Sequence, residues 1–126
     1  MLRGEEVRFG FVSTDATTAD EVVVYDNNGN VRAIAATERL IINSAVLSIA
    51  AAVVNARLFT DANADGTADE AEVLLAVEGA IATVVGDTAS METGSGLYCA
   101  VGLEPKVIAA NAGRVSCYGT GFILQG

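Results

Sequence analysis

The sequence predicts an all-β domain spanning residues 1–126, built as a jelly roll or β-sandwich of about nine to ten short antiparallel strands. Three observations lead to this prediction. Apolar and polar residues alternate at a period of two along several short segments. Glycine, Asn-Gly or proline separates these segments at short intervals. The length of 126 residues suits one domain with its own hydrophobic core.

The N-terminal quarter of the chain contains the first predicted strands. The segment VRFGFVST places Val7, Phe9 and Phe11 on one face at a period of two. The segment EVVVYDNNGNVRAI predicts a hairpin, in which Asn28 and Gly29 supply the positive φ of a tight turn. Both patterns are typical of strands that bury one side against a core.

The segment RLIINSAVLSI, at residues 39–49, predicts a strand that is apolar on both sides. Strict alternation places Leu40, Ile42 and Val46 on one side, and Ile41, Leu47 and Ile49 on the other. A strand with two buried sides is expected where one side meets the core and the other meets a neighbouring subunit.

The rest of the chain also consists of short predicted strands. VVNARLFT and EVLLAVEG, at 53–60 and 72–79, lie on either side of an acidic loop. The C-terminal third reads GLYCAVGL, KVIAAN, RVSCYG and GFILQG, with turn residues between these runs. The paired glycines of GSGLYC (94–99) and GTGFIL (119–124) are expected at tight turns between strands, because neither segment has the third glycine of a phosphate-binding loop.

A helical alternative exists for the middle of the chain. TERLIINSAVLSIAAAVVNARLF also permits an Ala-rich helix, with Thr37 as its N-cap, leading into an EF-hand loop and an exit helix. However, β-branched residues crowd this segment, and Gly79 interrupts the exit helix. Ala68 also stands where an EF-hand has a larger aliphatic residue. Strands are therefore the preferred interpretation.

The acidic loop DANADGTADEAE, at residues 61–72, has the spacing of a calcium-binding loop. The bend falls at Gly66. The candidate metal ligands are Asp61, Asn63, Asp65, Asp69 and Glu72. A bound calcium ion would stiffen this hairpin rather than take part in chemistry. The same residue types also form a plain, solvated acidic turn, and both interpretations stay open.

Charge and residue types exclude several functional classes. The chain has 16 acidic and 7 basic residues, a net charge of −9, and no cluster of Lys and Arg. We therefore expect neither nucleic acid nor an anionic membrane as a partner. The chain has no histidine, which excludes Ser–His and Cys–His nucleophile pairs and His-based zinc sites. We expect no enzymatic activity.

Hydrophobic residues make up 52% of the chain, more than a small soluble monomer usually needs. We expect an oligomer with apolar interfaces to bury the surplus. The most apolar stretch, LIINSAVLSIAAAVV (40–54), is shorter than the roughly 20 residues of a membrane span. The N-terminus shows no secretory signal, so Cys99 and Cys117 are expected as reduced, buried thiols, with a cross-strand disulfide as the alternative.

A short, acidic, Gly- and Ala-rich β chain that opens with VRFGFVST and ends in VIAANAGRVSCYGTGFILQG resembles the small cement or decoration proteins of tailed-bacteriophage capsids. The resemblance implies a structural virion protein, made in the host cytoplasm and placed on the capsid surface. It also implies a jelly-roll homotrimer that bridges neighbouring copies of the major capsid protein. Arg3, Arg8 and Arg57 are available to pair with acidic groups of such a partner.

Two other functions remain open. One is a calcium-dependent adhesion or carbohydrate-binding β-sandwich module. Such sites stack sugars on exposed aromatic rings, and Tyr25, Tyr98 and Tyr118 are the only plausible platforms in a chain without tryptophan. The other is a phage tail or baseplate component, which would use the same kind of small β scaffold.

Overall fold

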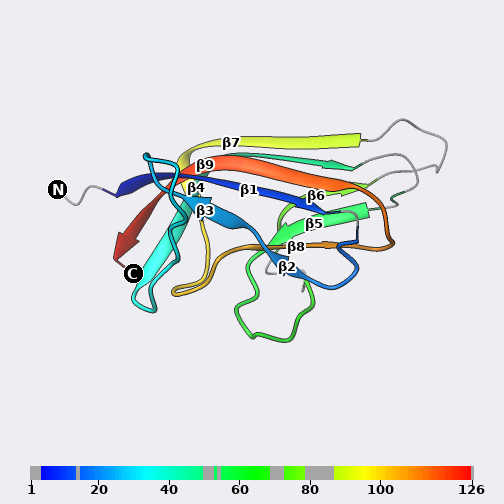
Figure 1. The fold of residues 1–126 in the computed structure, drawn as a ribbon, viewed down its shortest axis with the longest axis horizontal. Coiled ribbons are helices and arrows are strands. Elements are labelled where there is room, and N and C mark those ends of the chain that lie inside the picture. The colour runs from blue at the N-terminus through cyan, green and yellow to red at the C-terminus, as the bar shows by residue number, and fades with distance from the viewer. Residues whose placement is uncertain are drawn as a thin grey trace.

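The computed structural model describes residues 4–13, 15–49, 53, 55–68, 73–78 and 87–125, and for residues 78 and 87–95 it describes the backbone. Within these residues the chain forms nine strands and no helix, arranged as two antiparallel sheets (Figure 1). The all-β prediction is confirmed. No helix in the described part of the chain is long and apolar enough to cross a membrane.

One sheet has five strands and the other has four. The five-stranded sheet consists of β1 (Glu5–Ser13), β3 (Val23–Tyr25), β4 (Glu38–Ile49), β7 (Asp87–Tyr98) and β9 (Val115–Gln125), in the order β3-β1-β9-β4-β7. The four-stranded sheet consists of β2 (Asp20–Glu21), β5 (Asn55–Phe59), β6 (Val73–Glu78) and β8 (Lys106–Ala109), in the order β2-β8-β5-β6.

The strand pairing follows the plan of a jelly roll. Apart from the short β3, the described strands pair in nested order: the first pairs with the last, the second with the second to last, and so on. These pairs are β1 with β9, β2 with β8, β4 with β7, and β5 with β6. The pattern is that of one long antiparallel ribbon, with its tip between β5 and β6, rolled so that β9 meets β4 and β8 meets β5. The acidic loop leaves β5 at this tip.

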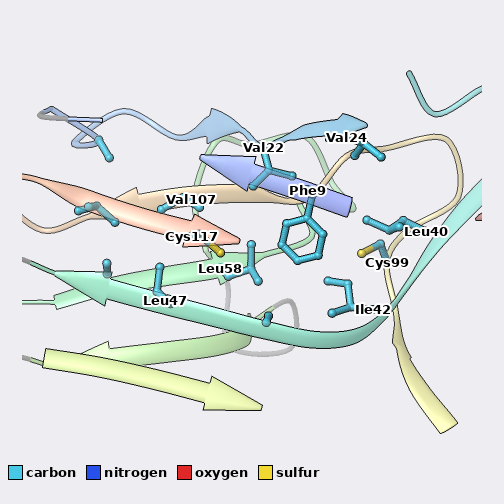
Figure 2. Packing of buried hydrophobic residues seen from close by; sticks show 14 of the residues in the cluster. Phe9, Val22, Val24, Leu40, Ile42, Leu47, Leu58, Cys99, Val107 and Cys117 are labelled. Atoms are coloured by element: carbon cyan, nitrogen blue, oxygen red, sulfur yellow. The ribbon is translucent and has the colours of Figure 1, made fainter. Parts of the chain in front are cut away.

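The core fills the space between the two sheets. Val7 and Phe9 of β1 are each 2% exposed, and Phe11 packs partly buried against the same cluster. The predicted apolar face of this strand is therefore confirmed. Figure 2 shows the ring of Phe9 reaching into the space between the sheets, near Leu58 of β5 and Cys117 of β9. Burial of this kind supplies most of the stabilising free energy of a sandwich.

A bulge in β4 interrupts the alternation that the sequence predicted for the segment 39–49. The pairing register of β4 shifts between Ile42 and Ser44, so the side chains exchange faces at this point. The residues of β4 in the core are Leu40, Ile42, Ala45, Leu47 and Ile49. The opposite side of the strand keeps Ile41 and Val46 beside serines. The predicted assignment of these residues to the two sides was wrong, because it assumed an alternation without a bulge; apolar residues do occur on both sides.

The turn after β3 differs in detail from the predicted hairpin. Gly29 has a φ of 82°, as expected, whereas Asn28 has no positive φ. Instead, the Asp26 carboxylate organises the turn, because its Oδ1 accepts the backbone N–H groups of Asn28 and Asn30 at 2.9 Å each. A side-chain cap thus replaces the second positive φ that a two-residue turn would need.

The paired glycines near the C-terminus lie inside strands, not at turns. Gly96 lies in β7, and Gly119 and Gly121 lie in β9, which runs through both predicted strands RVSCYG and GFILQG without a break. A Cβ at Gly119 or Gly121 would collide with the backbone oxygen of Ser44 or Ile41, respectively. These glycines therefore allow β9 to approach the bulged β4 closely.

Cys99 and Cys117 are free, buried thiols, as the sequence predicted. Burial raises the pKa of each thiol from its ordinary value of 9.0 to about 12, because the thiolate would lose its hydration. Both thiols are therefore expected to resist a thiol reagent such as DTNB at pH 8 in the folded protein, and to react fully in denaturant. A rapid reaction of either thiol in the folded state would contradict this burial.

An ion pair fixes the connection between β3 and β4. Arg32 donates from Nη1 and Nη2 to the two carboxylate oxygens of Glu38, at 2.9 and 2.6 Å. The backbone N–H of Ala35 donates to Glu38 at 2.9 Å, and Arg32 also contacts Glu5 at 3.2 Å. Glu38 is only 8% exposed. This bidentate ion pair holds the connection against the first residue of β4.

The Glu38 network predicts a loss of stability in acid. Its hydrogen bonds from Arg32 and Ala35 lower the pKa of Glu38 from 4.5 to about 2. The contribution of this group is complete above the unfolded-state pKa of 4.5 and is lost as the pH falls toward 2. Melting temperatures should therefore fall more steeply over this range in the wild type than in Glu38→Gln. Parallel profiles for the two proteins would contradict the prediction.

Candidate functional site

The acidic loop is organised around the carboxylate of Asp61. Asp61 follows β5 and is 2% exposed, although its neighbours in the loop lie on the surface. Its Oδ1 accepts the backbone N–H of Asp65 at 3.2 Å, and its Oδ2 accepts that of Gly66 at 3.0 Å. Ala64 and Gly66 adopt positive φ values of 56° and 75°, which bend the loop back toward this carboxylate.

A lysine from another strand supplies the positive charge at Asp61. Lys106 Nζ lies 3.1 Å from Asp61 Oδ2. Lys106 opens β8 and is in register with Phe59 of β5, so the pairing of these strands brings the ammonium group to the start of the loop. The loop spacing contains no signal for this partner, which lies 45 residues further along the chain. The ammonium group balances the one fully buried acid of the described loop.

The five predicted calcium ligands are only partly brought together in the described structure. Asp61, Asn63 and Asp65 lie in the loop, and Asp69 and Glu72 lie outside the described residues. Among the residues that the structure describes, no three His, Cys, Asp or Glu side chains are grouped to hold a metal ion. Strands flank the loop in place of the EF-hand helices. The calcium interpretation stays a prediction, and the contacts of Asp61 favour the plain turn.

Calcium is expected to leave the stability of the protein unchanged. Both oxygens of Asp61 already accept hydrogen bonds, and the Lys106 ammonium group would repel a second cation at the first loop position. Thermal melts in excess calcium and in chelator should therefore coincide. A higher melting temperature in calcium, reversed by the chelator, would show that the loop is a calcium site.

A second candidate site is the outer face, which is the side of the five-stranded sheet that points away from the core. Five of the seven exposed large hydrophobic residues in the described chain lie on it. The five are Val12, Val23, Tyr25, Tyr98 and Tyr118, with exposed fractions from 36% to 64%. Strand alternation opposite the buried residues of β1, β3 and β9 places them on this side.

The outer face carries few charges for so acidic a chain. Among its described side chains only Glu6, Arg8 and Arg39 are charged. The guanidinium of Arg39 lies over the ring of Tyr98, 5.6 Å from its centroid. A surface with exposed Tyr, Val and Arg but few acidic residues has the composition of a protein–protein interface.

The opposite side of the sandwich carries an open pocket beside the acidic loop. The pocket has a volume of about 340 Å³ and is lined mainly by Asn55 and Arg57 of β5, Thr67 of the loop and Ile108 of β8. Arg57 has no ion pair with any residue in the described part of the chain. Arg8 on the outer face also has no ion pair with the described residues. Arg3, the third arginine expected to pair with a partner, lies outside the described residues.

Comparison with known proteins gives no assignment: no protein-family model, curated protein or solved structure matches this chain. The functional interpretation of the outer face and of the Arg57 pocket therefore depends on their geometry alone. The sequence identified the three tyrosines of the outer face and the two arginines, Arg8 and Arg57, as residues able to contact a partner. It did not place them on shared surfaces, because strand order decides which residues become neighbours.

Proposed function

We propose that this chain is a structural protein that assembles with copies of itself and decorates a larger protein shell. The outer face carries this proposal, because its tyrosines and valines form an apolar surface that no described part of the chain covers. A β-sandwich that works alone has no need of such a surface on one sheet. The resemblance to cement proteins of tailed phages suggests the shell, which would be a capsid made of the major capsid protein.

A protein that joins a shell to its own copies needs two separate contact surfaces. The outer face is one, and the pocket around Arg57 on the opposite sheet is the other. Arg57, which has no ion pair with the described residues, suits an acidic group on the shell, since a guanidinium forms paired hydrogen bonds with carboxylates. The acidic groups near this pocket would in turn favour basic patches beside that carboxylate.

Cosedimentation with capsids tests shell binding. The purified protein is mixed with phage heads stripped of their outer proteins, and the pellet is expected to retain it in a fixed ratio to the major capsid protein. Arg57→Gln should weaken retention by about fivefold, as expected for a partly exposed charge pair. Arg114→Gln removes the same charge from a loop outside the pocket and should not. Absence of the wild type from the pellet would overturn the proposal.

The number of copies is a separate part of the proposal. The resemblance suggests a homotrimer, so light scattering or native mass spectrometry should give three times the chain mass of 12.9 kDa. A monomer at micromolar concentration would contradict self-assembly of any kind. Other multiples would retain self-assembly and change only the symmetry.

A carbohydrate-binding module is a second candidate, because the three tyrosines named as stacking platforms share the outer face. Tyr25, Tyr98 and Tyr118 are 36%, 56% and 54% exposed. Aromatic rings on one sheet face provide a surface on which sugar rings can stack. A glycan array distinguishes the two functions. Glycan binding that Tyr118→Ala abolishes would favour this candidate over shell decoration.

A further inference from the structure

The outer face contains an open slot above Gly10, next to an exposed aromatic ring. A Cβ built on Gly10 would meet no atom within 4 Å, so the space above this residue is empty. The residues in register on either side are Val23 of β3 and Tyr118 of β9. Tyr118 is 54% exposed and is the largest side chain beside the slot. A protruding ring and an opening that could receive it thus lie side by side on neighbouring strands.

We propose that the outer face packs against the outer face of a second copy of the chain, with Tyr118 of each copy entering the slot above Gly10 of the other. This inference rests on the self-assembly in the proposed function and identifies one surface for it; because a two-fold contact joins two copies, a trimer would form through another surface. It does not depend on the identity of the shell.

The strand register supports this self-complementary contact. A two-fold axis that runs parallel to the strands, midway between β1 and β9, exchanges the positions of Gly10 and Tyr118. The same axis places Val23 of β3 opposite Val46 of β4 in the second copy, because these residues flank Gly10 and Tyr118 at equal distances. One row of the sheet therefore places every large apolar residue against an apolar residue or an empty slot.

Polar residues in the next row are also compatible with this arrangement. The row through Arg8 reads Tyr25, Arg8, Thr120 and Ser44 across the four strands. The axis places Arg8 opposite Thr120 of the second copy, whose hydroxyl can accept a hydrogen bond from the guanidinium. Tyr25 falls opposite Ser44, which can bond to the phenol oxygen. The geometry is the aligned face-to-face packing that β-sheets favour.

The strand lengths set the area of this contact. β1, β4 and β9 each offer about 30 Å of strand length and the short β3 about 10 Å, so strands about 4.8 Å apart give roughly 480 Å² on each copy. The pair would bury roughly 960 Å² in total, which is the size of a small protein–protein interface.

Two substitutions test the contact without disturbing the fold. Gly10→Val fills the slot, in a position where a side chain has open space within its own chain and where a β-branched residue suits a strand. Tyr118→Ser removes the ring that enters the slot, and Tyr118 is exposed in the single chain. Each variant should raise the dissociation constant of the pair at least about 30-fold, as loss of a central aromatic contact does. Val101→Thr, at a residue 40% exposed in the turn after β7, is the control and should have no effect.

Analytical ultracentrifugation of the full chain, with circular dichroism to check the fold, separates this inference from the proposed trimer. A dimer that both variants convert to monomer supports the contact and overturns the trimer. A hexamer that both variants convert to trimer supports both. A trimer unaffected by either variant overturns the outer-face contact and retains the proposed function. A wild-type monomer overturns both.

Discussion

The substitution Gly119→Ala is expected to destabilise the protein by at least about 3 kcal/mol, which is a large part of the about 5–15 kcal/mol that holds a small domain folded. The added methyl group would strike the backbone oxygen of Ser44 and the ring of Phe9. The oxygen belongs to the bulge of β4 and cannot move without breaking the pairing of β4 with β9. The Phe9 ring is 2% exposed and has no free volume to enter.

The matched control is Gly10→Ala, on the neighbouring strand β1. Nothing lies within 4 Å of the added methyl group there, and alanine is a better strand residue than glycine. We expect a change within about 1 kcal/mol, in the stabilising direction. Urea denaturation of the two variants measures both effects. Equal stabilities for Gly119→Ala and Gly10→Ala would show that β9 does not approach β4 as closely as the structure describes.

The substitution Asp61→Ala is expected to cost about 3 kcal/mol, which is typical when one member of a buried ion pair is removed. The variant loses the contact with Lys106 at 3.1 Å and leaves that ammonium group without a counter-charge. It also leaves the backbone N–H groups of Asp65 and Gly66 without their acceptor, so the loop loses the group around which it bends.

Asp26→Ala is the control for this loop effect. Asp26 also accepts two backbone N–H groups in a turn, at 2.9 Å each, but has no lysine partner and is less buried. Its loss should cost only about 1 kcal/mol. A double-mutant cycle with Lys106→Met isolates the ion pair and should give a coupling of about 1–3 kcal/mol. A coupling near zero would assign the whole effect of Asp61 to the loop hydrogen bonds.

The sequence was sufficient to predict the fold class, because period-two patterns directly reflect one buried side of a strand. Val7, Phe9 and Phe11 carried that signal and lie as expected. The signal failed where strands deviate from a regular pleat. The bulge in β4 exchanged the faces of Ala45, Leu47 and their neighbours, and no local residue preference marks such a shift.

Strand boundaries were less predictable for a related reason. β9 was divided into two predicted strands at Gly119 and Gly121, since glycines usually interrupt strands. β7 was predicted to start near Gly96, whereas it begins at Asp87 in a polar segment with weak strand preference. In both cases contact with β4 decides the conformation, and such a contact between distant segments has no local signature.

In the candidate sites, too, the features set by neighbouring residues in the sequence were predictable, and those set by contacts between distant strands were not. The turn-forming residues of the acidic loop were visible as a spacing, and Gly66 bends the loop as expected. The Lys106 partner of Asp61 depends on the pairing of β5 with β8. Likewise, the slot above Gly10 exists only because Val23 and Tyr118 are brought to either side of it by two other strands.

The pairing of β1 with β9 has a consequence for biosynthesis. β1 is the first described strand to be synthesised, and its principal neighbour, β9, is the last. The apolar side chains of Val7 and Phe9 therefore lack this neighbour until the ribosome has made all the strands between them. Slow folding of the five-stranded sheet is expected, because the two strands that pair are so far apart in the chain.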